Sequence, residues 1–186
     1  TFDTFNYNPD NPVPTIGGQS QLIEHCGPQN RYEIETRDDI LIYTTNKLKY
    51  DTEVTGKIEI VLYASSSAID TDFTATLVDV YPDNKCIHIS DGIIRTKFRE
   101  SYENPSLISP NNIYTFVFPL WETSNVFKKN HKIRLEISSS NFPRFNRNLN
   151  TGKDMYDDKE IIICNQKIYH NRSYPSHVIL PIIPTD

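Results

Sequence analysis

Residues 131–139 read His-Lys-Ile-Arg-Leu-Glu-Ile-Ser-Ser, and this stretch decides the fold class. Ile133, Leu135 and Ile137 alternate in it with charged side chains. Because successive side chains of an extended strand point to opposite faces, the stretch is predicted to be a strand with one buried and one solvated face. Similar alternation, or a short continuous apolar run, occurs at residues 40–44, 57–65, 73–77, 113–121, 161–163, 167–169 and 177–180. No window shows the i, i+3, i+4, i+7 pattern of an amphipathic helix, so we expect little helix.

Turn chemistry separates these stretches. Residues 81–84, Tyr-Pro-Asp-Asn, predict a hairpin turn in which Asn84 adopts a left-handed backbone conformation. Residues 113–121 are apolar on both faces, which predicts a central strand until Pro119 limits its hydrogen bonding. Roughly eight or more strands with irregular connections predict an all-β domain, a two-sheet β-sandwich of the jelly-roll type.

The first thirty residues differ from the rest of the chain. They are rich in proline and glycine, which favours an extended, irregular backbone, and they carry apolar anchors such as Phe2, Phe5 and Tyr7. We therefore predict that residues 1–30 form a lead-in strap packed on another surface, and that residues 31–186 form a single sandwich domain. The chain starts at Thr1 and not at a methionine, which suggests a piece of a longer protein.

Composition narrows the choice of partner and compartment. The formal net charge is -5, with no long run of like charges, which argues against a nucleic acid or an anionic membrane as partner. No apolar run approaches the roughly 18 residues that a membrane-spanning helix needs. Cys26, Cys86 and Cys164 are widely spaced, so we expect three unpaired thiols, two of them buried, in the reducing environment of the cytoplasm.

Motifs that carry chemistry are missing from the sequence. The stretch nearest to a GxSxG nucleophile elbow, residues 18–22, lacks the closing glycine. His131 and the serines at 138–140 lie at opposite ends of one predicted strand, about 20 Å apart at ~3.3 Å per residue, so they cannot pair within it. There is no HExxH motif, Walker loop or dinucleotide fingerprint. The sequence thus predicts no catalytic residue, no metal site and no cofactor.

Three carboxylates stand next to apolar strand patterns. Asp70 and Asp72 could share a calcium ion or cap backbone N–H groups, and the second interpretation is favoured because no glycine-centred ligand loop follows. Asp79 interrupts an apolar run, and a buried carboxylate needs a cation or several hydrogen-bond donors; Arg95 or Arg99 is the candidate cation. We predict that Asp72 and Asp79 are buried, hydrogen-bonded and structural.

Residues 138–152 form the most unusual stretch, a long asparagine-rich loop predicted to follow a strand. It carries Asn141, Phe142, Arg144, Phe145 and Arg147. Large apolar side chains are unfavourable to leave in water, so the loop either folds back on its own sandwich or presents these groups to a partner. The sequence leaves both alternatives open.

Taken in order along the chain, the segments resemble the carboxy-terminal domain of the X-Pro dipeptidyl-peptidase and cocaine-esterase family of serine hydrolases. The segments that carry the resemblance are residues 12–18, 39–44, 55–56, 65–68, 70–73, 77–83, 91–95, 138–152, 169–170, 175–177 and 180–181. The resemblance implies a galactose-binding-like jelly roll that follows an α/β-hydrolase domain. In that family the catalytic Ser, Asp and His all lie in the hydrolase domain, so no catalytic residue carries over to this chain.

The resemblance implies a non-catalytic supporting domain of a peptidase or esterase, which walls one side of a substrate pocket or joins two protomers in a homodimer. A second hypothesis is a carbohydrate-binding jelly-roll module, because eleven tyrosines could furnish stacking platforms. A third is an autonomous hydrolase with an unrecognised triad.

The 186-residue chain is expected to hydrolyse neither p-nitrophenyl esters nor X-Pro anilides, because it lacks a nucleophile elbow. Spectrophotometric assays of the purified chain test this expectation. Turnover that survives repurification and is abolished by one Ser→Ala substitution would contradict it.

Overall fold

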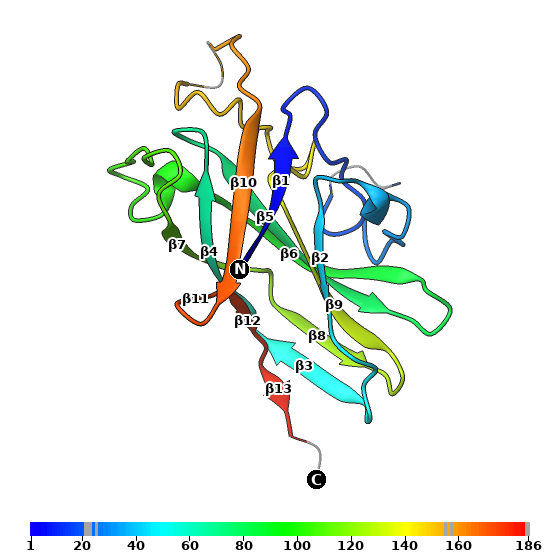
Figure 1. Cartoon of the computed structure of the whole chain (residues 1–186). Coiled ribbons are helices and arrows are strands. Elements are labelled where there is room, and N and C mark those ends of the chain that lie inside the picture. Colours follow the sequence, from blue (N-terminus) through cyan, green and yellow to red (C-terminus); the bar gives the residue numbers. More distant parts are fainter. Residues whose placement is uncertain (21–23, 25, 155, 157, 185–186) are drawn as a thin grey trace.

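The computed structural model describes residues 1–20, 24, 26–154, 156 and 158–184, and it is built almost entirely of strands (Figure 1). The helical turns it describes are η2 (Ile34–Thr36) and η3 (Thr96–Phe98). The strands are β1 (Phe2–Tyr7), β2 (Leu41–Thr44), β3 (Thr52–Gly56), β4 (Glu59–Ser66), β5 (Asp72–Val80), β6 (Cys86–Arg95), β7 (Tyr114–Pro119), β8 (Thr123–Phe127), β9 (Lys132–Ser138), β10 (Cys164–Asn171), β11 (Tyr174–Pro175), β12 (His177–Ile179) and β13 (Ile182–Ile183).

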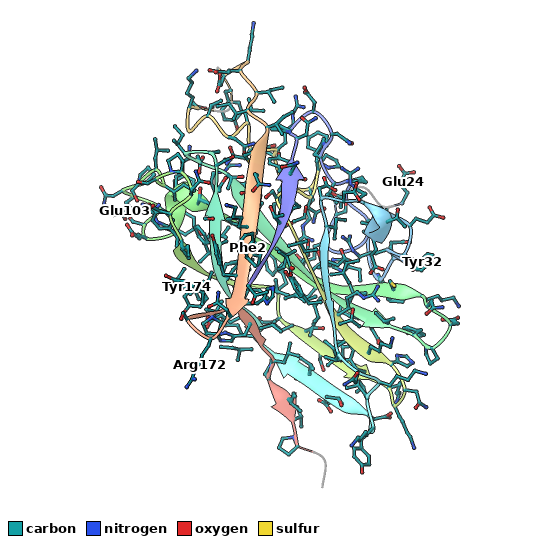
Figure 2. The ribbon with its side chains drawn as sticks, in the orientation of Figure 1. Phe2, Glu24, Tyr32, Glu103, Arg172 and Tyr174 are labelled. Carbon is teal, nitrogen blue, oxygen red and sulfur yellow. The ribbon has the colours of Figure 1, made fainter. Side chains whose placement is uncertain are left out.

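Two sheets face each other, and their side chains fill the space between them (Figure 2). The first contains β1-β10-β4-β12, with β7 on the other side of β4 and β11 beside β10. The second has the order β2-β9-β5-β6, and a small third sheet has the order β13-β3-β8. The predicted all-β sandwich is confirmed, as is the scarcity of helix; the jelly-roll subtype stays a prediction.

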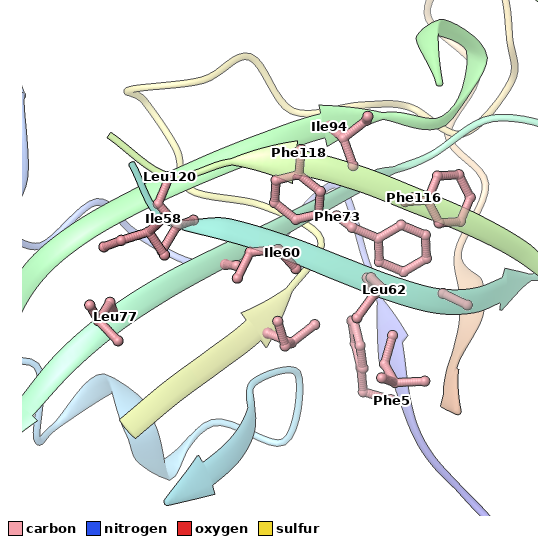
Figure 3. Close-up of a cluster of buried hydrophobic side chains, with 14 of the residues drawn as sticks. Phe5, Ile58, Ile60, Leu62, Phe73, Leu77, Ile94, Phe116, Phe118 and Leu120 are labelled. Atoms are coloured by element: carbon pink, nitrogen blue, oxygen red, sulfur yellow. The ribbon is translucent and has the colours of Figure 1, made fainter. Parts of the chain in front are cut away.

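The main core lies between the two sheets (Figure 3). Ile60 and Leu62 of β4 and Phe116 of β7 pack against the second sheet, where the ring of Phe73 in β5 lies 5.2 Å from that of Phe116. These residues recur at every second position along their strands, which is the period that places them on one face. The alternation in the sequence therefore located the core correctly.

The second sheet is covered on its outer face as well. All nine residues of β5 are buried, including Thr74 and Thr76, which point away from the main core. Residues 9–18, 30–40 and 141–148 lie over this face, and Val13, Ile34 and Ile40 form a small core of their own there. The domain is thus a sandwich with an additional layer of irregular backbone on one side.

Several strands differ from the sequence predictions. The start of the predicted irregular lead-in is strand β1, because Phe5 and Tyr7 alternate with polar residues and reach the core. Residues 113–121 form an edge strand and not a central one, since β7 pairs with β4 alone among the described strands. Residues 161–163 form no strand; they follow the asparagine-rich loop, to which Ile162 hydrogen-bonds through the carbonyl of Leu149.

The hairpin turn at residues 81–84 is confirmed. It joins β5 to β6, and Asn84 has a φ of 67°, in the left-handed region that asparagine tolerates.

Two buried thiols, those of Cys86 and Cys164, are also found as expected. In the described part of the chain, no helix has the length and apolar character to cross a bilayer.

Replacing Gly92 by alanine is expected to destabilise the domain by about 1–3 kcal/mol, because the added methyl group would overpack a rigid site. A Cβ at this position of β6 would lie 2.3 Å from the carbonyl oxygen of Pro119, and backbone cannot turn aside as a flexible side chain does. Urea denaturation of the Gly92→Ala variant measures the effect. An unchanged free energy of unfolding would show that β6 and β7 are not in such close contact.

Candidate functional site

Two irregular segments that are far apart in the sequence lie side by side. We call residues 9–18 the proline strap and residues 141–152 the asparagine loop. The N–H of Phe142 donates to the carbonyl of Val13 (2.8 Å), and its carbonyl accepts from the N–H of Thr15 (2.7 Å). Arg147 Nη1 donates to the carbonyl of Pro9 at 2.8 Å. The two segments therefore form one continuous surface, here called the braced surface.

Asn148 ties the asparagine loop to the second sheet. Its Nδ2 group donates to Asp70 Oδ2 (3.2 Å) and to Asp72 Oδ1 (2.9 Å), while its Oδ1 atom accepts from the N–H of Asn150 (2.8 Å). The carbonyl of Asn148 accepts from the hydroxyl of Tyr7 at 3.0 Å. All of these side chains are buried, so each one satisfies a polar group that water does not reach.

The two carboxylates below Asn148 are held by protein donors. Asp72 receives a fork from Arg95, with Nε to Oδ1 at 2.8 Å and Nη2 to Oδ2 at 2.9 Å. Asp70 accepts from the hydroxyl of Thr96 (2.8 Å) and the N–H of Lys97 (3.1 Å). Burial raises the pKa of Asp72, against the opposite effect of the Arg95 guanidinium. This arrangement matches the structural interpretation of Asp70 and Asp72, including the cap on a backbone N–H.

A third buried carboxylate, Asp91, anchors the start of the asparagine loop. It accepts from Arg144 Nη1 and, at 2.9 Å, from Asn141 Nδ2. Gly18 of the proline strap packs on Arg144, because a Cβ there would lie 2.6 Å from Nη1. The Gly18 φ of +79° also favours a residue without a side chain. Arg144 is therefore a buried brace.

The start of the asparagine loop also exposes an aromatic side chain. The side chain of Phe142 is 41% exposed, and the guanidinium of Arg144 lies 5.0 Å from the ring centre of the half-buried Phe145. Arg147 is partly exposed and lies 3.3 Å from Asp10. The loop thus combines the two alternatives. Asn141, Arg144 and Asn148 fold back onto the second sheet, whereas Phe142 faces outward.

The partner predicted for Asp79 is wrong. Its burial is confirmed, but the group beside it is His131, whose Nδ1 lies 2.9 Å from Asp79 Oδ1, and not Arg95 or Arg99. Arg95 donates to Asp72 instead, and Arg99 donates to the carbonyls of Thr96 and Ser106. Burial raises the pKa of Asp79, against the opposite effect of His131.

The buried pair of Arg31 and Glu136 was missed at the sequence level. Glu136 lies on the face of β9 that was predicted to be solvated, yet it is only 2% exposed. Arg31 Nη2 donates to Glu136 Oε2 at 2.6 Å, and Arg31 Nη1 donates to the carbonyl of Ile16. The two residues are 105 positions apart, so no local pattern pointed to the pair.

The described residues assemble no triad. Among their hydrogen bonds, no histidine pairs with a serine or a cysteine, although Asp79 contacts His131 and Asp3 contacts His170. Within the same ranges no three His, Cys, Asp or Glu side chains gather as a metal site would require. Gln21 and Leu22, which end the stretch nearest to a nucleophile elbow, lie outside the described residues.

Aromatic side chains gather on the outer face of the first sheet. Phe2 and Tyr63 stand in register with Tyr169 on neighbouring strands, and Tyr174 packs beside the two tyrosines. The ring centres are 5.5–5.8 Å apart, but neighbouring rings are tilted by 54–61°. Phe2 and Tyr174 are marked in Figure 2. The tilted rings therefore form no single flat surface, and the carbohydrate-binding hypothesis stays a prediction.

Comparison with known proteins gives a consistent result. Residues 1–179 match the family model of the X-Pro dipeptidyl-peptidase C-terminal non-catalytic domain. The chain is 44% identical to a cocaine esterase of Rhodococcus sp. (strain MB1 Bresler), over 97% of the chain and 32% of that relative. It is 29% identical to a putative Xaa-Pro dipeptidyl-peptidase of Bacillus anthracis, over 55% of the chain and 17% of that protein.

A solved structure described as an α-amino acid ester hydrolase superimposes with a TM-score of 0.91 at 25% identity, over 98% of this chain and 32% of that one. This chain thus spans a third or less of the length of these relatives.

Asn148→Ala is expected to cost about 2–4 kcal/mol of stability, since two buried carboxylates and a backbone N–H each lose a hydrogen-bond partner. Asn146→Ala in the same loop is the matched control, because Asn146 is exposed and its replacement should change stability by less than about 0.5 kcal/mol. Denaturant unfolding of both variants measures the difference. Equal stability of the two variants would show that Asn148 does not hold the loop.

Proposed function

The chain belongs to the family of X-Pro dipeptidyl-peptidase C-terminal non-catalytic domains, and we propose that it supports an α/β-hydrolase domain that precedes it in the full-length protein. The observation that carries this proposal is the braced surface. It combines an exposed Phe142 with a loop held by a buried ion pair and buried hydrogen bonds, and a rigid apolar surface is suited to docking against another domain.

The hydrolase domain would perform the chemistry. A serine attacks the carbonyl carbon of an ester or amide, a histidine takes the serine proton and passes it to the leaving group, and backbone N–H groups stabilise the oxyanion. The names of the relatives include both an esterase and a peptidase, so either bond type fits the proposal. This chain would contribute no reacting group.

Rigidity explains how the braced surface would serve a neighbouring domain. Asp91 fixes the side chain of Arg144, and Asn148 fixes the far end of the loop, so Phe142 is presented without further ordering of the backbone. A contact that orders nothing on docking keeps more of its interaction energy. We therefore place Phe142, Phe145 and Arg147 at the contact with the hydrolase domain, beside its substrate pocket.

Two further features of the full-length protein are proposed. The first is a cytoplasmic location, where thiols stay reduced. Burial raises the pKa of Cys86 to about 12 and that of Cys164 to about 11, which keeps both thiols protonated and inert. The full-length protein is also proposed to form a homodimer, for which light scattering after size-exclusion chromatography is the direct measurement.

Phe142→Ala should lower the melting temperature of the full-length protein but leave that of the 186-residue chain almost unchanged. The side chain is 41% exposed in the isolated domain, so its packing is gained only on docking. Tyr50→Ala, at an exposed site away from the braced surface, is the control and should affect neither protein. Calorimetry of the two proteins gives the comparison.

The same variant also tests the non-catalytic role. Loss of a docking contact should change kcat by only a fewfold. A fall in kcat of about a hundredfold (~2.7 kcal/mol of barrier) at an unchanged melting temperature would place Phe142 at the reacting centre and overturn the proposal.

A further inference from the structure

An apolar cleft of about 330 Å³ opens between the two sheets, away from the braced surface. Its floor is made by buried aliphatic side chains of both sheets, among them Ile60, Leu62, Ile137 and Ile168. Leu135 and Val178 line it as well and are only partly buried. The main core is therefore incompletely covered along this side of the sandwich.

The cleft lies between two edge strands. Among the described strands, β12 pairs with β4 alone and β2 pairs with β9 alone. Each of them contributes to the wall, β12 through His177 and Val178 and β2 through Tyr43 and Thr44. An edge strand leaves a row of backbone N–H and C=O groups unpaired, which is a template for another strand.

The N-terminal end of β1 lies next to this edge. β1 pairs with β10 on the side away from β4, and β12 occupies the place beside β4 that β10 leaves free beyond Tyr169. Both β10 and β12 run antiparallel to β4, whereas β1 runs antiparallel to β10. Residues that continued β1 in the upstream direction would hence meet the free edge of β12 in antiparallel orientation.

The beginning of β1 is fixed at the mouth of the cleft. Asp3 accepts from the hydroxyl of Tyr43 (2.9 Å) and lies 3.1 Å from His170 Nε2, and both of these residues line the cleft. Asn171 Nδ2 donates to the carbonyl of Thr1 at 3.3 Å. These contacts direct the polypeptide that leads into Thr1 past the opening.

We propose that, in the full-length protein, the residues leading directly into Thr1 extend β1 along the free edge of β12 and close the cleft with apolar side chains. The proposal rests on the proposed function, which places a hydrolase domain upstream. The relatives are about three times as long as this chain, so a lead-in segment of sufficient length is available in proteins of this kind. A strand satisfies both needs of the site, because it pairs with the β12 backbone while alternate side chains enter the cleft.

Thiol reactivity tests the proposal. Val178→Cys is made in a Cys26→Ser background, both in the full-length protein and in the 186-residue chain, and the reaction with a soluble disulfide reagent is timed. The lead-in strand should slow the reaction at least about tenfold in the full-length protein, since the thiol reacts only when the strand opens. Hydrogen exchange should slow in parallel for those amides of residues 177–179 that face away from β4, because backbone pairing protects them.

Val117→Cys is the matched control, because Val117 is 49% exposed on β7, on the other side of β4. Its thiol should react equally fast in both proteins. Equal rates for the Val178→Cys variant in the two proteins overturn the proposal. Protection at both positions overturns it too, since a whole domain surface and not one strand would then cover the sheet. The Phe142→Ala experiment is independent, so a failure of docking at the braced surface is distinguishable from a failure here.

Discussion

The carboxamide of Asn148 is the contact on which one end of the molecule depends. Asp70, Asp72 and Tyr7 are all buried near it, and each lies on a different part of the fold: the entry to β5, β5 itself and β1. Two buried carboxylates so close together need donors, and Arg95 supplies only part of them. The loop must therefore return to this point, and the path of residues 141–152 is constrained by polar groups more than by apolar packing. Asp72 is buried, and this burial raises its pKa despite these partners.

The charged pairs of the domain share a geometry that suits positioning and not chemistry. Arg31 with Glu136, Arg144 with Asp91, and Arg95 with Asp72 all join strands of the second sheet to each other or to the segments that cover it. Burying a charge pair costs desolvation energy that the attraction between the charges does little more than offset, so such pairs add specificity more readily than stability. Here they determine where the proline strap and the asparagine loop lie on the sheet. A catalytic dyad would instead hold one group ready for a substrate, whereas each of these carboxylates has its oxygens occupied by protein donors.

The features that were predictable from the sequence are those that depend on neighbouring residues. The alternation of Ile133, Leu135 and Ile137 indicated β9, and Pro82 with Asn84 indicated the hairpin, because strand period and turn conformation are local properties. The partners of Asp79 and Glu136 lie 52 and 105 residues away, and only the fold brings them together. Strand β3 was missed because Thr52–Gly56 has one buried apolar residue, Val54, and β7 was taken for a central strand because its exposed Val117 looks like a core residue in sequence.

The outer face of the second sheet is covered by irregular segments of the chain, whereas the outer face of the first sheet is not. This difference suits the two faces to different contacts. The second sheet is covered by its own chain, so the surface beyond it is rigid and its few exposed apolar groups are held in place. The first sheet keeps a bare outer face, with Phe2 and Val117 about half exposed, and it ends at an open seam between β12 and β2. A docking contact needs a shape that does not change, which the braced surface has. An open seam needs a strand to complete its hydrogen bonds, which the proposed extension of β1 would provide. The two proposals together hold the proposed hydrolase domain twice, through a rigid surface contact at one site and through a continuous strand at the other.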